Sequence, residues 1–122
     1  MSRIITIQTQ FRDIDMLKTC LETLECQVLH EPNGIKLRGA STPVELLVHA
    51  PFGSFGFRRA SDGQYEIVGD DFVLGRQQKF IHNLTQQYAY RKVLKDAAAA
   101  GYQLVHEERR ENREIRLVVR KW

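Results

Sequence analysis

The stretch IITIQTQFRDIDMLKTCLETLECQVLHEPNGIKLR, residues 4–38, decides the fold. Apolar and polar residues alternate through residues 5–10, which is typical of a strand with one buried face. Asp13 follows at a position that favours a helix N-cap, because its carboxylate can accept hydrogen bonds from the first free N–H groups. Apolar side chains then recur at helical spacing through residues 14–24. This half of the stretch predicts a strand and then a helix of about three turns.

The second half of the stretch predicts a hairpin. Strands at 27–30 and 35–38 flank Pro32-Asn33-Gly34, a turn signal because Asn and Gly tolerate positive φ. A similar pattern returns near the end of the chain, where Gln103-Leu104-Val105-His106-Glu107 parallels Gln27-Val28-Leu29-His30-Glu31 and an amphipathic helix again precedes it. We therefore predict a βαββ internal repeat.

The rest of the chain predicts three central strands, one long helix and a closing hairpin. The central strands have apolar cores, and Ser61-Asp62-Gly63 is a strong turn signal between two of them. Gly101 is placed to end the helix as its C-terminal cap. The expected elements are strands at 44–49, 55–58, 65–68, 102–108 and 114–121 and a helix at 75–100.

Together these elements predict an α+β fold, with an antiparallel sheet and two helices on one face. The other face of such a sheet is left to water or to a partner. A chain of 122 residues is one domain by length, so we expect a single α+β domain over residues 1–122.

Composition places the protein among ordinary globular domains. It is 43% hydrophobic and 27% charged, with a net charge of +3. We expect no membrane span, since no apolar run approaches the ~20 residues that a span needs. We expect a reducing compartment, the cytoplasm, because two closely spaced cysteines do not make a secreted disulfide scaffold and the first residues alternate like a strand. The mild positive charge permits an anionic partner but does not require one.

The sequence contains no recognisable catalytic or metal-binding motif. Cys20 and Cys26 lack zinc spacing, and the four histidines are scattered singly. Gly53 and Gly56 stand between expected strands and not before a helix, so they do not form a phosphate loop. We therefore expect no metal, no cofactor and no catalytic residues, and a protein that is not an enzyme. Triads assembled from distant positions escape such a search.

The long helix carries a candidate pocket. Gln87 and Arg91 interrupt its apolar stripe, and Tyr88 flanks the same turn. A buried Arg must pair, reach solvent or face a cavity. One interpretation is a pocket in which Arg91 binds an anionic group and Gln87 orients it. The alternative is that the helix bends near Ala89 and returns both side chains to solvent.

The last strand predicts a candidate interaction surface. If its apolar residues at 115, 117 and 119 face the core, the intervening side chains project from the opposite face, together with two basic residues of the first hairpin. A basic face with an aromatic end suits RNA, and it suits a protein partner equally well; a solvated outer face is the third interpretation. The candidate residues are Lys36, Arg38, Arg116, Arg120 and Trp122.

Three segments resemble the family of hypothetical chloroplast reading frame 35, also called domain of unknown function 1257. They are Thr6-Ile7-Gln8-Thr9-Gln10-Phe11-Arg12-Asp13, Leu84-Thr85-Gln86-Gln87-Tyr88-Ala89, and the ending from Gly101-Tyr102 to Arg120-Lys121-Trp122. Members occur in cyanobacteria, algal plastids and some other bacteria. The resemblance implies a location in the cytoplasm, or in the stroma for plastid relatives. It supplies no catalytic residues.

The family's association with genes for AAA-type ATPases implies an accessory or assembly role. The leading hypothesis is therefore a non-catalytic protein-interaction or assembly-factor domain, with an AAA-type ATPase system as one candidate partner. The alternatives are an RNA-binding module and a small-anion pocket at the long helix. The sequence leaves open whether the sheet closes by forming a homodimer.

Overall fold

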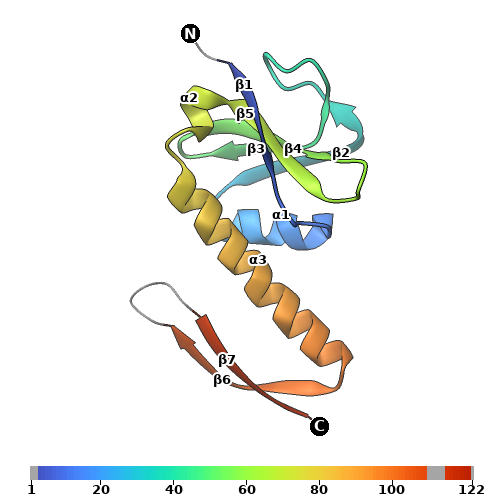
Figure 1. Ribbon diagram of the computed structural model, residues 1–122, viewed down its shortest axis with the longest axis vertical. Coiled ribbons are helices and arrows are strands. Elements are labelled where there is room, and N and C mark those ends of the chain that lie inside the picture. The colour runs from blue at the N-terminus through green and yellow to red at the C-terminus, as the bar shows by residue number, and fades with distance from the viewer. Residues whose placement is uncertain (1–2, 110–114, 122) are drawn as a thin grey trace.

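The computed structural model of the chain describes residues 3–109 and 115–121, and the side chains of residues 3–101 (Figure 1). These residues form seven strands and three helices. The strands are β1 Ile4–Gln8, β2 Gln27–Ile35, β3 Val44–Ala50, β4 Gly53–Arg59, β5 Tyr65–Asp70, β6 Tyr102–Arg109 and β7 Ile115–Lys121, and the helices are α1 Ile14–Thr23, α2 Asp71–Leu74 and α3 Gln78–Ala99. Their order along the chain is β1-α1-β2-β3-β4-β5-α2-α3-β6-β7.

Five strands form one antiparallel sheet in the order β1-β5-β4-β3-β2, so β1 and β2 are its edges. Helices α1 and α3 pack on each other, and their buried residues Leu17, Leu21 and Leu84 join the sheet residues in one core. The predicted α+β class, an antiparallel sheet with two helices on one face, is confirmed. The predicted caps are confirmed as well: Asp13 accepts from the N–H of Met16, and Gly101 follows α3 with φ of 86°.

Aromatic rings fill the core between the sheet and the helices. Phe55 and Phe57, two residues apart on β4, are fully buried and point to the helix side. Phe80 of α3 meets Phe55 edge-on, with ring centroids 5.9 Å apart. At the other end, Phe11 packs on Tyr88 of α3 at 4.7 Å. These contacts hold α3 against the sheet along its first three turns.

The predicted turn at Pro32-Asn33-Gly34 is wrong. The structure continues β2 to Ile35, and the pairing with β3 shifts register between His30 and Ile35. The segment is a bulge in an edge strand, where Pro is tolerated because its missing N–H faces no partner. Gly34 does adopt a positive φ, 105°, as the sequence suggested, but within the bulge and not in a hairpin turn.

Because β2 ends at Ile35, the predicted strand over 35–38 is also wrong. Leu37 instead turns back onto the outer face of the sheet, where it forms a second buried cluster with Val44 and Val68. The outer face is therefore partly covered by the connection between β2 and β3. This corrects the expectation that the whole face away from the helices is open.

The closing hairpin forms where it was predicted but stands apart from the main sheet. β6 and β7 pair with each other as a separate two-stranded sheet beyond the end of α3 (Figure 1). The first half of the chain instead pairs β2 with β3 inside the five-stranded sheet. The two halves thus share the order strand, helix, strand, strand and differ in how the last two strands are used.

Replacing Gly56 tests how tightly the outer cluster is packed. A Cβ at Gly56 would lie 2.7 Å from both methyl carbons of Val44, closer than side chains approach. We expect Gly56→Ala to lower the free energy of unfolding by about 1–3 kcal/mol, measured by urea denaturation. Adding Val44→Ala should recover part of this loss, because it removes the clashing methyl groups. Strictly additive losses would contradict the contact.

Candidate functional site: the open edge of β1 and its groove

The backbone of β1 offers hydrogen-bonding groups along the edge of the sheet. The N–H of Asp71 donates to the carbonyl of Arg3 at 2.9 Å, and the pairing continues in the same register, with Ile5 opposite Gly69 and Ile7 opposite Ile67. Hydrogen-bonded pairs alternate along an antiparallel ladder. The odd residues therefore bond to β5. The residues that direct their backbone N–H and C=O to the open edge are Ile4, Thr6 and Gln8.

The two edges of the sheet differ in how they are protected. Natural edge strands avoid unwanted pairing by carrying charges, prolines or bulges. β2 carries Glu31, Pro32 and the bulge that follows. β1 reads Ile-Ile-Thr-Ile-Gln and has none of these devices between Ile4 and Gln8. The edge of β1 therefore lacks the charge, the proline and the bulge that β2 carries.

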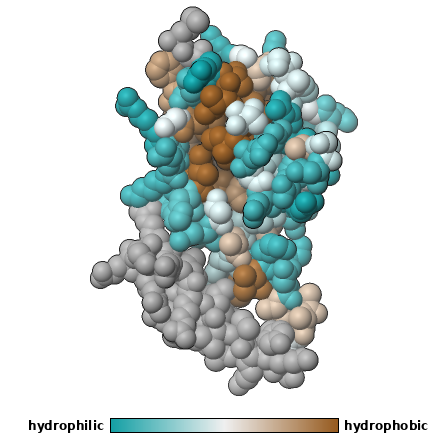
Figure 2. All heavy atoms as spheres, viewed as in Figure 1, coloured by the Kyte–Doolittle hydropathy of each residue, from teal (hydrophilic) through white to brown (hydrophobic). Residues whose placement is uncertain are grey.

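A groove of about 360 Å³ runs between this edge and α3. One wall follows β1 into the segment after it, and the other is a stripe of α3 residues three or four positions apart. Figure 2 shows hydrophobic residues gathered over β1 and the beginning of α3, with hydrophilic residues around them. The lining residues are Ile7, Gln8, Thr9, Gln10 and Phe11 from the sheet side and Ile81, Thr85, Tyr88, Ala89 and Lys92 from α3.

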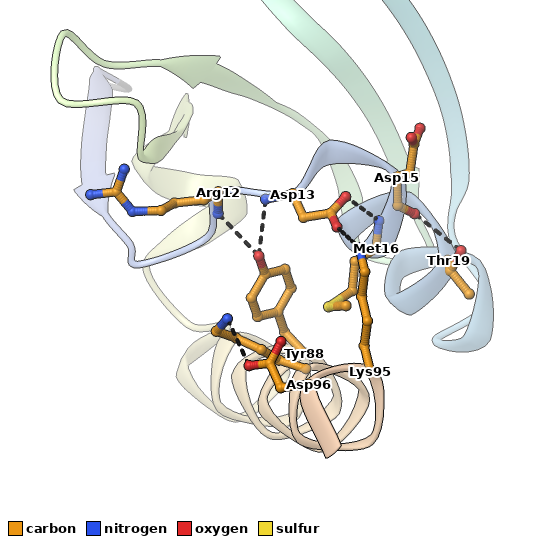
Figure 3. Close-up of polar contacts among 9 residues, drawn as sticks. Arg12, Asp13, Asp15, Met16, Thr19, Tyr88, Lys95 and Asp96 are labelled. Carbon is orange, nitrogen blue, oxygen red and sulfur yellow. Dashed lines mark hydrogen bonds and ion pairs between the residues drawn. The ribbon is translucent and has the colours of Figure 1, made fainter. Parts of the chain in front are cut away.

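Tyr88 fixes the width of the groove. Its side chain points from α3 to the segment between β1 and α1, where its hydroxyl oxygen accepts the backbone N–H groups of Arg12 at 3.1 Å and Asp13 at 3.0 Å (Figure 3). Tyr88 is 7% exposed, so these bonds are shielded from water. The groove wall on the β1 side is therefore tied directly to the wall on α3.

An ion pair reinforces the same junction. Lys95 of α3 donates to the carboxylate of Asp13 at 2.9 Å, while the other oxygen of Asp13 accepts from the N–H of Met16 (Figure 3). The bond from Lys95, followed by that from Met16, holds the pKa of Asp13 below its ordinary value. Asp13 thus caps α1 and binds α3 with one side chain.

The structure separates the three residues of the predicted pocket. Tyr88 lines the groove, whereas Arg91 lies half-buried against α1, with Nη2 donating to Thr23 at 3.1 Å. Burial raises the pKa of the Cys20 thiol, and the adjacent Arg91 guanidinium acts against that rise. The helix does not bend at Ala89, since α3 runs unbroken from Gln78 to Ala99. Gln87 is half-buried as well and does not line the groove.

The residues of the predicted basic surface lie in two separate segments of the chain. Lys36 and Arg38 are exposed in the connection after β2. Arg38 lines a cavity of about 540 Å³ together with Arg3 and Asp70. Arg116 and Arg120 lie in β7, but their side chains, like the whole of Trp122, lie outside the described part of the chain.

Sequence reasoning missed a row of polar side chains that crosses four neighbouring strands. Tyr65 of β5 donates from its hydroxyl to Glu45 of β3 at 2.6 Å and accepts from Nη2 of Arg59 of β4 at 2.5 Å. Nε2 of His30 of β2 lies 3.4 Å from the same carboxylate oxygen of Glu45. Burial raises the pKa of Tyr65, so the phenol remains the donor. The hydrogen bonds of the row tie β3, β4 and β5 together at one end of the core, and His30 of β2 lies beside them.

No local pattern in the sequence could have revealed this row. Glu45 stands between Val44, which packs on the outer face, and Leu46, which packs in the core on the helix side. Simple alternation would place both valine and leucine on one face. Glu45 lies opposite the bulge of β2, where the regular pairing is interrupted, and a bulge depends on the partner strand.

Within the described residues, no three His, Cys, Asp or Glu side chains come together as a metal ion would require. No helix in this part of the chain is long and apolar enough to cross a membrane.

The fold and groove define a small α+β domain with one unguarded strand edge, and comparison with known proteins gives its family. The chain belongs to the family described as "Protein of unknown function (DUF1257)", whose profile matches residues 20–118. This confirms the resemblance stated from the sequence.

Relatives in this family span the whole chain. It is 28% identical over 127 residues to "Uncharacterized protein ycf35" of Cyanophora paradoxa, and the match covers 100% of this chain and 98% of the relative. The proteins of the same description from Guillardia theta and Pyropia yezoensis are 28% and 26% identical with the same coverage. No solved structure matches the fold.

Removing the Tyr88 hydroxyl should loosen the groove. Tyr88→Phe keeps the ring on Phe11 but leaves the N–H groups of Arg12 and Asp13 without this acceptor, which costs about 1–3 kcal/mol. We expect faster amide hydrogen exchange at Arg12 and Asp13, measured by NMR, and a lower urea midpoint. Exchange as slow as in the wild type would show that the hydroxyl does not hold the segment.

Two variants of Asp13 separate its cap from its charge. Asp13→Ala removes both and should cost about 1 kcal/mol for the cap alone, whereas Asp13→Asn keeps a good cap and loses the bond to a charged Lys95. The folded pKa is lowered, so the charged form stabilises the fold above the ordinary value of 3.8. That stabilisation is lost as pH falls through the folded pKa.

The wild type should therefore exceed Asp13→Asn in stability at pH 7, with the difference shrinking below pH 3.8 as Asp13 protonates. Urea denaturation at a series of pH values measures this difference. A difference that is constant with pH would contradict the ion pair.

Proposed function

We propose that the protein is a non-catalytic protein-interaction domain that acts as an assembly factor. Its receiving surface is the edge of β1 together with the groove against α3, and its ligand is an extended segment of a partner protein. The open backbone groups of Ile4, Thr6 and Gln8 beside that groove are the observation that carries this proposal.

The physical basis is strand addition. An extended peptide that pairs with a sheet edge gains affinity from main-chain hydrogen bonds and specificity from pockets for alternate side chains. Here the edge offers the main-chain groups, and the stripe of α3 with Ile81 and Tyr88 offers contacts for side chains on the helix side. Both walls are held in place by the Tyr88 hydroxyl, so little ordering is needed on binding.

The location and the partner class follow as part of the same proposal. Free, buried Cys20 and Cys26 suit a reducing compartment, the cytoplasm or, for plastid relatives, the stroma. An AAA-type ATPase system is a partner class that an assembly factor of this family would serve.

RNA binding is the alternative, supported by one observation. Arg3 and Arg38 line the cavity of about 540 Å³ on the outer side, and a phosphate could approach there. Asp70 lines the same cavity and opposes an anion. For an RNA ligand, the logarithm of the affinity would fall linearly with the logarithm of the salt concentration, unlike that of a strand added to β1.

A matched pair of variants tests strand addition. Thr6 is exposed and its N–H faces the open edge, so Thr6→Pro removes an edge donor and keeps every bond to β5. Thr6→Val keeps the N–H and serves as the control. We expect the wild type and Thr6→Val to capture partner proteins from nuclease-treated extract. Thr6→Pro should capture about tenfold less, equivalent to about 1.4 kcal/mol.

The variants must first be shown to fold alike. The circular dichroism spectrum and the urea midpoint of Thr6→Pro should match those of Thr6→Val, because the side chain at position 6 does not belong to the core. Equal capture by the two folded variants would refute strand addition at β1. Recovery of nucleic acid, or of proteins lost on nuclease treatment, would favour the RNA alternative.

A further inference from the structure

The β6–β7 hairpin is incomplete as the structure shows it. It is a two-stranded sheet, and an isolated pair of strands is only marginally stable in water without a third strand or a covering face. Among the described elements, its contacts are with α3. Both of its outer edges remain without a strand partner in the described part of the chain.

The two edges of the hairpin are not equivalent. The pairing shifts register between Leu104 and His106, so β6 carries an irregularity. β7 runs through Ile115–Lys121, a sequence rich in β-branched residues and without Pro or Gly. β7 is longer than the five residues of β1, so it can pair with the whole of that edge.

The hairpin cannot reach the β1 edge of its own chain while α3 stays intact. α3 is a continuous helix of 22 residues, about 33 Å long, and it carries the hairpin away from the five-stranded sheet (Figure 1). The groove, by contrast, begins near Ile81 in the first turn of α3. Lys92, its one charged lining residue, is already paired with Asp96 at 3.2 Å, so it presents little net repulsion to the basic strand β7.

We propose that β7 of a second copy pairs with β1 and that the two copies exchange hairpins reciprocally. Each five-stranded sheet then gains the two strands of the other copy's hairpin. The α3 residues that line the groove cover the added strand β7. The exchange closes about a two-fold axis and stops at two copies. This inference rests on the proposed function, because it names a second copy of this chain as the partner that supplies the extended segment.

The molecular mass in solution tests the assembly. Light scattering of the full chain should give twice the 14.2 kDa of one copy for the wild type and for Thr6→Val. Thr6→Pro should give 14.2 kDa, because it lacks the edge donor at the centre of β1. A wild type that stays at the mass of one copy at high concentration would overturn the proposal.

Cysteine pairing between copies tests which strands meet. Thr6→Cys protein is mixed under mild oxidation with a separately tagged variant, Leu117→Cys, Val118→Cys or Val119→Cys. We expect one of the three to form an intermolecular disulfide with residue 6, identified by mass spectrometry, since a disulfide requires neighbouring Cβ atoms. Ser61→Cys, exposed in the turn between β4 and β5, is the control for random collision. Native Cys20 and Cys26 are buried and do not compete.

Two outcomes separate this inference from the function it rests on. A disulfide that joins residue 6 of one copy to residue 6 of another, without any to β7, would overturn hairpin exchange in favour of direct β1 pairing. A monomeric wild type whose partner capture is still lost in Thr6→Pro, but not in Thr6→Val, would overturn hairpin exchange and leave strand addition standing.

Discussion

The hydroxyl of Tyr88 is the contact on which the geometry of the candidate site depends. It accepts two backbone N–H groups from the segment that leaves β1 and enters α1, so it joins three elements at a point shielded from water. The same segment is also bonded to β5, because the carbonyl of Phe11 accepts the N–H of Tyr65 at 2.8 Å. Strand β1, helix α1 and helix α3 are therefore positioned by one short stretch of chain.

The two edges of the five-stranded sheet differ in how easily they could pair with another strand. β2 is bulged, contains Pro32 and folds its continuation over the outer face, all of which oppose pairing with another strand. β1 is short, regular and uncharged, and α3 stands beside it with a stripe of partly apolar side chains. The five-stranded sheet therefore has one obstructed edge and one open edge, and α3 lies beside the open one.

Secondary structure was largely predictable because it depends on local patterns. The cap at Asp13, the turn at Ser61-Asp62-Gly63 and the helix end at Gly101 were each marked by residues whose backbone preferences act over a few positions. The turn predicted at Pro32-Asn33-Gly34 was wrong for the same reason. Those residues suit a turn and a bulge equally, and the pairing with β3 decides between them.

The candidate site was only partly predictable. Tyr88 drew attention because it flanks the polar interruption of the long helix, and the structure places it in the groove wall. Gln87 and Arg91 interrupt the same stripe and lie elsewhere, Arg91 against Thr23 of α1. The row formed by His30, Glu45, Arg59 and Tyr65 was invisible in the sequence, since its members come from four strands and meet only through their register.

The sequence by itself determined the α+β class, most of the elements and the family, because propensities, caps and alternating patterns are local and the relatives match over the whole chain. Only the tertiary structure decided which strand became the open edge and what lay beside it. Strand order depends on pairing between residues far apart in sequence, such as Ile4 with Asp70, and no local pattern encodes it. The open edge, its groove and the separate hairpin are consequences of that long-range pairing.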